Sequence, residues 1–262
     1  MSGSGTGTLF IVATPIGNLE DITFRAIRTL KEVDLIACED TRHTRKLLTH
    51  LQIEKPLTSY FEHNKLVKGE WLVKEILSGK NVALVSDAGT PVISDPGYNL
   101  VKSAIEQGIP VVPIPGPSAT IAALSAAGLP TDRFLFIGFL PQKEGKKRRL
   151  IESLRSEAGT LVFYESPFRV KKTLKLLAGI LGDRQAVLAH ELTKIHEGFL
   201  RGTLAGLAAG PIVEKGEWVV LISGSFQNLG NSPDRTDQDE QAEEEGEEFG
   251  RRNLQPGPPR GG

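Results

Sequence analysis

The chain has 262 residues, of which 39% are hydrophobic and 24% charged, and it carries a formal net charge of −1 with a single cysteine, Cys38. This length allows one large domain or two modest ones with a sizeable core. One cysteine excludes an internal disulfide and disfavours a cysteine-based metal site. No apolar run is long enough to span a bilayer and residues 1–7 lack the parts of a secretory signal, so we expect a cytoplasmic protein with no membrane partner.

The charges are distributed unevenly along the chain. Residues 231–262 hold nine acidic residues and four arginines. Without them the totals of 32 acidic and 31 basic residues fall to 23 and 27, which leaves about +4 on residues 1–230. A mildly basic body permits a nucleic-acid partner without requiring one. The segment 231–262 has little to bury, so we expect it to be disordered, and we expect the glycine-rich residues 1–7 to be flexible.

Short apolar runs alternate with helical patterns through the first half of the chain. Runs rich in β-branched residues predict buried strands at 8–14, 35–38, 82–85 and 111–114, with a further extended segment at 57–61. Apolar residues at helical spacing predict a helix capped by Asp21 or Thr23, a helix opened by Glu39-Asp40-Thr41-Arg42, and helices at 64–77 and 98–106. Strands and helices that alternate in this way pair in parallel through right-handed crossovers.

A second half with a different pattern begins near Ser118. It predicts helices at 119–127, 150–156 and 169–181, and strands at 134–139, 160–164, 186–189 and 218–223. Because neither half shows an internal repeat and the halves differ, we expect two α/β domains, 8–117 and 118–230, that meet at a cleft.

The stretch 81–97 contains the strongest sequence feature, a buried strand that stops at a polar, glycine-bearing turn before the next helix. Its turn holds two Asp, two Gly and two Pro within eleven residues, as S-D-A-G-T-P and S-D-P-G. Gly89 permits backbone angles that other residues avoid, and Pro91 removes an amide donor. A carboxylate and a glycine turn at a strand's carboxyl end are typical of a ligand crevice in an open α/β sheet. An ordinary loop is the alternative, but the density of these residues favours a site.

Motif searches exclude several familiar chemistries. The sequence has no G-x-x-x-x-G-K-[ST] phosphate loop and no G-x-S-x-G elbow. The glycines of residues 1–7 precede a strand instead of following one, so they are not a dinucleotide fingerprint. His190-Glu191 begins like a zinc helix, but Lys194 stands where H-E-x-x-H requires the second histidine. We therefore expect no metal.

Five turns at predicted strand ends carry small or polar residues: Pro15-Ile16-Gly17-Asn18, Glu39-Asp40-Thr41-Arg42, Ser86-Asp87-Ala88-Gly89-Thr90, Pro115-Gly116-Pro117-Ser118-Ala119 and Glu165-Ser166-Pro167. Gly and Ala allow a ligand to lie against backbone groups. Asp87 could accept hydrogen bonds from ribose hydroxyls or an ammonium group. Because the turns offer little positive charge, they suit a nucleoside better than a polyphosphate.

A basic run, Lys143 to Arg149, precedes the predicted helix at 150–156. Its simplest interpretation is a solvated helix start. Together with arginines near predicted strand ends it could instead contact the phosphates of a nucleic acid. The candidate residues are Arg42, Arg45, Lys143, Lys147, Arg148 and Arg169.

Several blocks between residues 8 and 225 resemble those of a known family. They are T-P-I-G-N-L at 14–19, E-D-T-R at 39–42, S-D-A-G-T-P-V-I-S-D-P-G at 86–97, P-G-P-S-A at 115–119, G-F-L-P at 138–141, F-Y-E-S-P at 163–167 and E-L-T-K at 191–194. The family is that of the small-subunit ribosomal RNA methyltransferases I, within the tetrapyrrole methylase superfamily. This chain differs by having His190 where the family usually has Arg, and Phe168 where it has His.

The resemblance implies an S-adenosylmethionine-dependent enzyme that methylates the ribose 2′-oxygen of a cytidine in small-subunit ribosomal RNA. It also implies a homodimer of chains with two α/β domains, a mostly parallel N-terminal sheet and a mixed C-terminal sheet, with the cofactor between the domains. By position, the cofactor would contact Pro15, Asp87, Gly89, Thr90, Ser118, Ala119 and Tyr164.

Methyl transfer to a ribose hydroxyl is aided by a base. The candidates are Lys194, Glu191, Glu165 and Asp40. Lys194 would need burial or a cationic neighbour to be neutral, and Glu191 with Lys194 could equally be a surface ion pair. Two other functions stay open, a methyltransferase acting on a precorrin-like tetrapyrrole and a non-catalytic RNA-binding assembly factor.

Overall fold

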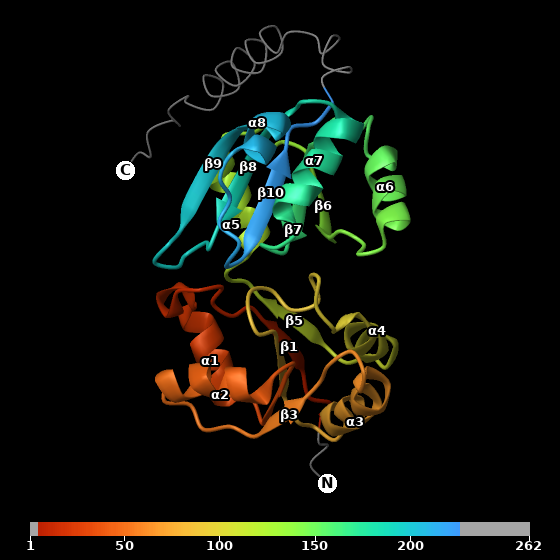
Figure 1. The fold of residues 1–262 in the computed structure, drawn as a ribbon. Helices are drawn as coiled ribbons and strands as arrows, with labels where there is room; N and C mark the ends of the chain where they lie inside the picture. The colour runs from red at the N-terminus through yellow and green to blue at the C-terminus, as the bar shows by residue number, and fades with distance from the viewer. Residues whose placement is uncertain (1–4, 226–262) are drawn as a thin grey trace, which may run out of the picture. The chain divides into compact units, whose positions relative to one another are not determined.

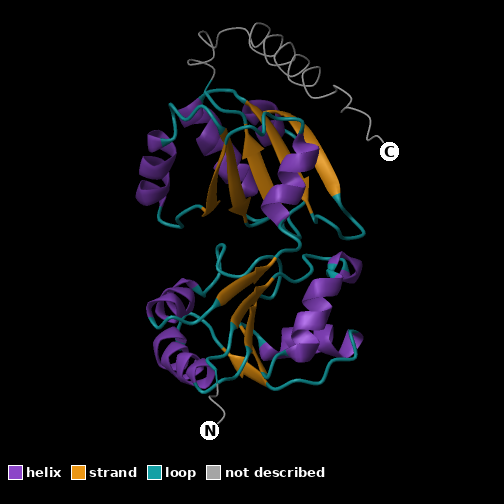
Figure 2. Cartoon of the chain, turned by 180° about the vertical axis from the view of Figure 1, so that it is seen from behind, coloured by secondary structure: helices purple, strands orange, loops and turns teal. Residues whose placement is uncertain are grey.

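The computed structural model describes residues 5–225. The predicted disordered segment at 231–262 lies outside these residues, as does most of the predicted flexible start. Along the described chain a first α/β domain is followed by a second (Figure 1), each built on a five-stranded sheet with helices on both faces (Figure 2). The expected fold class is therefore confirmed.

The first sheet is entirely parallel and has the strand order β3-β2-β4-β1-β5. Its strands are β1 (Leu9–Val12), β2 (Leu35–Cys38), β3 (Leu57–Ser59), β4 (Val82–Val85) and β5 (Val111–Ile114). Every residue of β2 and β4 is buried. A sheet covered on both faces requires such continuous apolar strands, which is the pattern the sequence shows.

Four helices cover the first sheet: α1 (Phe24–Glu32), α2 (Thr41–His50), α3 (Lys65–Leu77) and α4 (Tyr98–Glu106). Thr23 caps α1, because its hydroxyl accepts a hydrogen bond from the Ala26 N–H. Asp40 caps α2 by accepting from the N–H groups of Arg42 and His43. Both caps satisfy helix donors that have no partner within the helix.

The second sheet is mixed and has the order β6-β7-β10-β8-β9. Its strands are β6 (Phe134–Phe139), β7 (Thr160–Glu165), β8 (Gln185–His190), β9 (Gly198–Thr203) and β10 (Trp218–Ile222). Only the β6–β7 pair is parallel among these strands. The helices are α5 (Ala119–Ala127), α6 (Glu144–Ser153), α7 (Val170–Leu181) and α8 (Leu204–Ala209).

Three details of the second domain differ from the sequence-based expectation. Helix α6 starts at Glu144, not at 150, so the basic run forms its first turns. Strand β9 and helix α8 were not predicted at all. Strand β9 is an edge strand with no fully buried residue and little apolar alternation, and α8 has only six residues. Both elements lack the periodic signal on which prediction depends.

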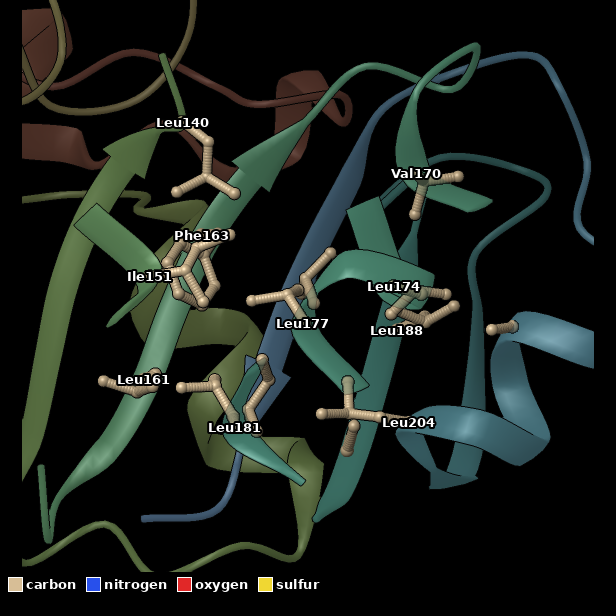
Figure 3. Close-up of a cluster of buried hydrophobic side chains, with 14 of the residues drawn as sticks. Leu140, Ile151, Leu161, Phe163, Val170, Leu174, Leu177, Leu181, Leu188 and Leu204 are labelled. Atoms are coloured by element: carbon tan, nitrogen blue, oxygen red, sulfur yellow. The ribbon is translucent and has the colours of Figure 1, made fainter. Parts of the chain in front are cut away.

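Each sheet is sandwiched between two apolar layers. In the second domain, α7 packs Leu174, Leu177 and Leu181 against β7 and β8, where Phe163 and Leu188 are buried (Figure 3). Helix α5 packs on the opposite face through a separate cluster. Burial of each Leu or Phe side chain contributes roughly 1.5–3 kcal/mol. These layers hold the strands rigidly and leave their ends free to carry function.

Candidate functional site

One cavity of about 330 Å³ is lined by strand-end turns from both sheets, and most of its lining surface is apolar. The first domain contributes Ile16, Asp87, Ala88, Gly89, Thr90, Ile93, Ser94 and Asp95. The second contributes Ser118, Ala119, Phe139, Tyr164, Glu165, Ser166, Pro167, Gly216, Glu217, Trp218 and Val219. A cavity of this size, with a few polar groups in an apolar wall, is typical of small-ligand sites.

The turn after β4 forms a rigid corner of the cavity. Gly89 has a φ of +83°, and its backbone exchanges two hydrogen bonds with Thr14, of 2.9 and 3.0 Å. The Ser86 hydroxyl donates to the Gly89 carbonyl at 3.1 Å. A left-handed backbone is unfavourable for residues with a Cβ atom, so this corner requires glycine. The ends of β1 and β4 are thereby tied together beside the cavity.

The acidic groups of the first domain lie close to one another. Burial raises the pKa of Asp95 to about 6, and the negative charges of Glu39 and Asp87 add to this shift, whereas a hydrogen bond from Ser86 opposes it. Burial also raises the pKa of Glu39, again with help from Asp87 and Asp40. Asp95 therefore titrates near neutral pH at the wall of the cavity, which is typical of functional carboxylates.

The segment that carries Asp95 has an unusual backbone. Val92 and Ser94 have φ values of 76° and 65°, in the left-handed region that residues other than glycine seldom adopt. For a β-branched residue such as Val92 this conformation is a true outlier. Backbone strain of this kind concentrates at binding and catalytic sites, because the surrounding structure must hold it.

An aromatic group forms the opposite side of the cavity. The Tyr164 hydroxyl lies 2.9 Å from Thr120 Oγ1, at the start of α5. Its ring meets those of Phe136 and Phe139 edge to face, with centroid distances of 5.0 and 5.5 Å. Such contacts favour one ring orientation over others. Tyr164 is thus fixed between α5 and β6.

Glu165, at the end of β7, is surrounded by donors. Its Oε1 accepts from Arg169 Nε at 2.9 Å and pairs with Arg169 Nη2 at 2.8 Å, and it also accepts from the Ser166 N–H. Its Oε2 accepts from the Thr173 hydroxyl at 2.7 Å and lies 4.0 Å from Lys147 Nζ. Both oxygens of this buried carboxylate are occupied, so its main role is to hold β7, α6 and α7 together.

Lys194 lies outside the cavity lining, in an ion-pair cluster that reaches the lining residue Glu217. Its Nζ is 2.9 Å from Glu191 Oε1 and 3.0 Å from Glu217 Oε2. Burial alone would lower the pKa of Lys194, but the two carboxylates outweigh it and raise the pKa. Burial pushes the pKa of Glu191 upward, yet hydrogen bonds from Lys194 and the Glu217 N–H bring it below its usual value. Lys194 is therefore firmly protonated in this arrangement.

The structure brings some predicted residues together and separates others. In the cavity lie six of the seven residues predicted for the cofactor, and one predicted base: Asp87, Gly89, Thr90, Ser118, Ala119, Tyr164 and Glu165. Pro15 is not in the lining, although its neighbour Ile16 is. Asp40, Glu191 and Lys194 are also outside it.

The predicted basic residues divide by exposure. Arg42, Lys143 and Arg148 are exposed, Arg169 is partly exposed and bound to Glu165, and Lys147 is buried beside Glu165. Arg42 lines a shallow hollow along α2 together with Arg45, Lys46 and His50. Only the exposed residues are available to meet a polyanion as they stand.

Sequence reasoning missed Asp95, Phe139, Glu217 and Trp218, which all line the cavity. Asp95 falls in the S-D-P-G turn, which was recognised as a turn but not as a source of a titrating group. Phe139 lies in the G-F-L-P block and Trp218 starts a predicted strand, but their place in the cavity depends on strand pairing, and Glu217 had no sequence signal. Within residues 5–225, no cluster of His, Cys, Asp and Glu has the arrangement needed to hold a metal ion. No helix in this part of the chain is both long and apolar enough to cross a membrane.

Comparison with known proteins defines the class. Residues 8–208 match the family model of the Tetrapyrrole (Corrin/Porphyrin) Methylases. The structure of uroporphyrin III C-methyl transferase from Thermus thermophilus aligns with a TM-score of 0.59 at 21% identity, over 83% of this chain and 97% of that one. A diphthine synthase structure aligns with a TM-score of 0.63 at 15% identity, over 83% and 90%. The chain belongs to the tetrapyrrole methylase family.

Relatives with higher sequence identity show to which branch of this family the chain belongs. A protein from Halalkalibacterium halodurans is 54% identical over 225 residues, which cover 85% of this chain and 78% of the relative. One from Bacillus subtilis is 49% identical over 224 residues, which cover 85% and 77%. Both carry the name ribosomal RNA small subunit methyltransferase I, and it is to this branch of the family that the chain belongs.

Proposed function

We propose that the protein transfers a methyl group from S-adenosylmethionine to the 2′-oxygen of a cytidine ribose in small-subunit ribosomal RNA, in the cytoplasm. The observation that carries this proposal is the single cavity in which the turns after β4, β5 and β7 meet. The names of the relatives supply the class of substrate. The 2′-oxygen, the cytidine and the cofactor come from the resemblance of the motif blocks.

The residues of the cavity fit a nucleoside cofactor. Gly89, Ser118 and Ala119 present a wall of small groups and backbone, against which a flat or folded nucleoside can lie. Asp87 offers a carboxylate for ribose hydroxyls or an ammonium group. The lining residues that would hold the cofactor are Asp87, Gly89, Thr90, Ser118, Ala119 and Tyr164, and Pro15 would contribute from beside the lining residue Ile16. When bound, S-adenosylmethionine supplies an electrophilic methyl group on a sulfonium sulfur, which leaves as a neutral thioether.

Asp95 is the group that we assign as proton acceptor for the ribose hydroxyl. Its carboxylate lines the cavity, and its pKa of about 6 lets it be ionised at pH 7 while binding a proton readily. A base works best when its pKa is near the operating pH. Burial raises this pKa most, the charges of Glu39 and Asp87 raise it further, and a hydrogen bond with Ser86 lowers it. Tyr164 lines the same cavity. The proton taken from the hydroxyl would leave to solvent through the cavity mouth.

The four earlier candidates fit the role of base less well. Lys194 is held protonated by two carboxylates, and Glu191 is engaged in the same cluster. Glu165 has both oxygens occupied by donors. The Asp40 carboxylate caps α2, and the hydrogen bond from the Arg42 N–H lowers its pKa. Each of these groups would have to break existing contacts before it could accept a proton.

Exposed or partly exposed cations at three helices would position the RNA. Lys143 and Arg148, at and near the start of α6, and Arg42 on α2 are exposed, and Arg169 has a third of its side-chain surface open next to the cavity-lining Ser166 and Pro167. Lys147 would act indirectly, through Glu165, which orients Arg169. Such contacts fix register on a phosphate backbone without reading sequence. We also propose a homodimer, on the family resemblance, which light scattering would test.

The test uses small ribosomal subunits purified from cells that lack this enzyme. Incubation with methyl-labelled S-adenosylmethionine should label the RNA, and nuclease digestion should place the label on a cytidine ribose. Ribonuclease-resistant label in a small product would favour the precorrin-like alternative, which the family model supports. Cofactor binding without any labelled product would overturn the proposal and favour an assembly factor.

A further inference from the structure

Phe139 is an aromatic residue at the wall of the cavity that does not serve the core. It is the last residue of β6, and 59% of its surface is exposed. Phe136 on the same strand is partly buried in the cluster beneath α5. Because this exposed ring lines the cavity, it is available to stack on a bound partner.

A β-bulge directs Phe139 into the cavity. Strand β6 pairs with β7 in regular register up to Phe136 and Val162, but the next pair is Gly138 with Phe163, so Ile137 is the extra residue. In an unbroken strand, residues 137 and 139 would share a face. The bulge reverses this, because Phe139 pairs with Tyr164, on the same face as Phe136. Bulges commonly redirect a side chain next to an active site.

Gly138 makes the bulge possible. Its φ is +71°, and a Cβ atom there would lie 2.8 Å from the hydroxyl oxygen of Ser94. The bulge therefore packs directly against the segment that carries Asp95, with no room for a side chain between them. Phe139 is thus placed beside Ile93, Ser94 and Asp95 in the lining of one cavity.

The cavity lining, together with the two residues that follow Pro167, has the composition of a single-stranded nucleic-acid site. Ile93 is 51% exposed in the lining, and Phe168, which follows the lining residue Pro167, is 78% exposed. Arg169 follows directly, and a third of its side-chain surface is exposed. Aromatic rings that stack bases, next to cations that meet phosphates, are how proteins bind unpaired strands.

We propose that Phe139 is a stacking platform for the base of the target nucleotide, turned out of its strand so that the ribose enters the cavity. The proposal rests on the function proposed above and names the form in which the substrate binds. A ribose inside a paired helix cannot reach an enclosed site, so the nucleotide has to be extruded. The cofactor's adenine is the competing occupant, and we assign it to the small residues Gly89, Ser118 and Ala119 of the same lining.

The experiment compares Phe139→Ala and Phe139→Trp with the wild type, in the presence of S-adenosylhomocysteine. The matched control is Phe134→Ala, which removes a 41% exposed ring from the same strand but outside the cavity lining. Binding is measured by fluorescence anisotropy with a short oligocytidylate and with an abasic ribose-phosphate strand of equal length. Phe139→Ala should weaken oligocytidylate binding about tenfold, equivalent to about 1.4 kcal/mol. It should leave the abasic strand unaffected, and Phe139→Trp should retain binding.

Several outcomes would overturn the platform. One is that the wild type binds the oligocytidylate and the abasic strand with equal affinity. Another is that Phe139→Ala weakens the binding of both nucleic acids equally. A parallel loss of S-adenosylhomocysteine affinity, measured by calorimetry, would show that the ring holds the cofactor instead. Methylation of ribosomal subunits is scored separately, so base-dependent binding without methylation would sink the proposed function and leave the platform standing.

Discussion

Two carboxylates line the same cavity, and their surroundings are opposite. Asp95 stands near Glu39 and Asp87, and its pKa is raised to about 6 by burial and by these charges. Glu165 stands among Arg169, Lys147 and Thr173, which occupy both of its oxygens. Groups of the same chemistry are thus assigned to different tasks by their neighbours, one to accept a proton and one to hold the scaffold.

The largest effect should come from Glu165→Gln, because it breaks the buried ionic network. The substitution leaves the Lys147 ammonium, whose side chain is only 7% exposed, without a counter-charge. Disrupting a buried pair from one side costs about 3 kcal/mol, which corresponds to a fall in Tm of roughly 6–12 °C for a domain of this size. Calorimetry would measure it, with the exposed Glu152→Gln on α6 as control. An unchanged Tm would mean that Glu165 does not hold the scaffold.

The second effect concerns Asp95 as base. Asp95→Asn should lower kcat about 100-fold, the usual loss for a general base, while S-adenosylmethionine affinity stays near the wild-type value. In the wild type, kcat should rise with pH through about 6, since the ionised form is the active one. The variant should lack this rise. Exposed Asp132→Asn serves as control. Near-normal turnover in Asp95→Asn would remove Asp95 from the mechanism.

The third prediction tests the corner formed by Gly89 after β4, in the domain that also carries Asp95. Gly89→Ala places a Cβ atom on a backbone with φ of +83°, 3.4 Å from Ile16 Cγ2. A left-handed backbone costs a residue with a Cβ atom about 1–2 kcal/mol. We expect the turn to move so as to relieve this strain, and that movement should weaken S-adenosylmethionine binding about tenfold. Gly108→Ala has similar strain at φ of +69°, with nothing within 4 Å and no place in the cavity. If both variants bind the cofactor equally, the corner does not shape its site.

A fourth prediction treats the raised pKa of Asp95 as a stability term. In the folded protein the pKa of Asp95 is about 6, above the ordinary 3.8. The stability that this group contributes is therefore fully present below about pH 4 and is lost as the pH rises through 6. Above pH 6 the ionised group destabilises the fold. Asp95→Asn should therefore raise stability at pH 8 by about 1 kcal/mol, after allowance for solvent screening, and by less at pH 5. Denaturant titrations at both values measure this, and a variant less stable at pH 8 would contradict it.

The smallest effect is expected from Arg148→Ala on α6, which is exposed. If Arg148 meets one phosphate, the variant should bind RNA a few-fold more weakly, and the slope of log affinity against log salt should fall by about 0.7–1. Exposed Lys31→Ala on α1 is the control. An unchanged salt slope would exclude Arg148 from the RNA surface.

Much of the architecture followed from the local pattern. All five strands of the first sheet lie in the predicted apolar or extended runs, Thr23 is the cap among the two candidates at α1, and α2 opens within the predicted E-D-T-R stretch. Strand β9 and helix α8 were missed because an exposed edge strand and a six-residue helix carry no periodic signal. The start of α6 was misplaced because its first turns are polar and almost wholly exposed.

By itself the sequence determined the alternation of elements, the glycine-bearing strand ends and the family, because these depend on residues that are neighbours in the chain. Tertiary structure decided which carboxylate titrates near neutral pH and which is locked. Asp95 owes its pKa to burial and to Glu39, which is far from it in sequence, and Glu165 is paired with Lys147 on α6 as well as with the nearby Arg169. Tertiary structure also decided that Phe139 faces the cavity, because one extra residue in a strand pair reverses every side chain beyond it.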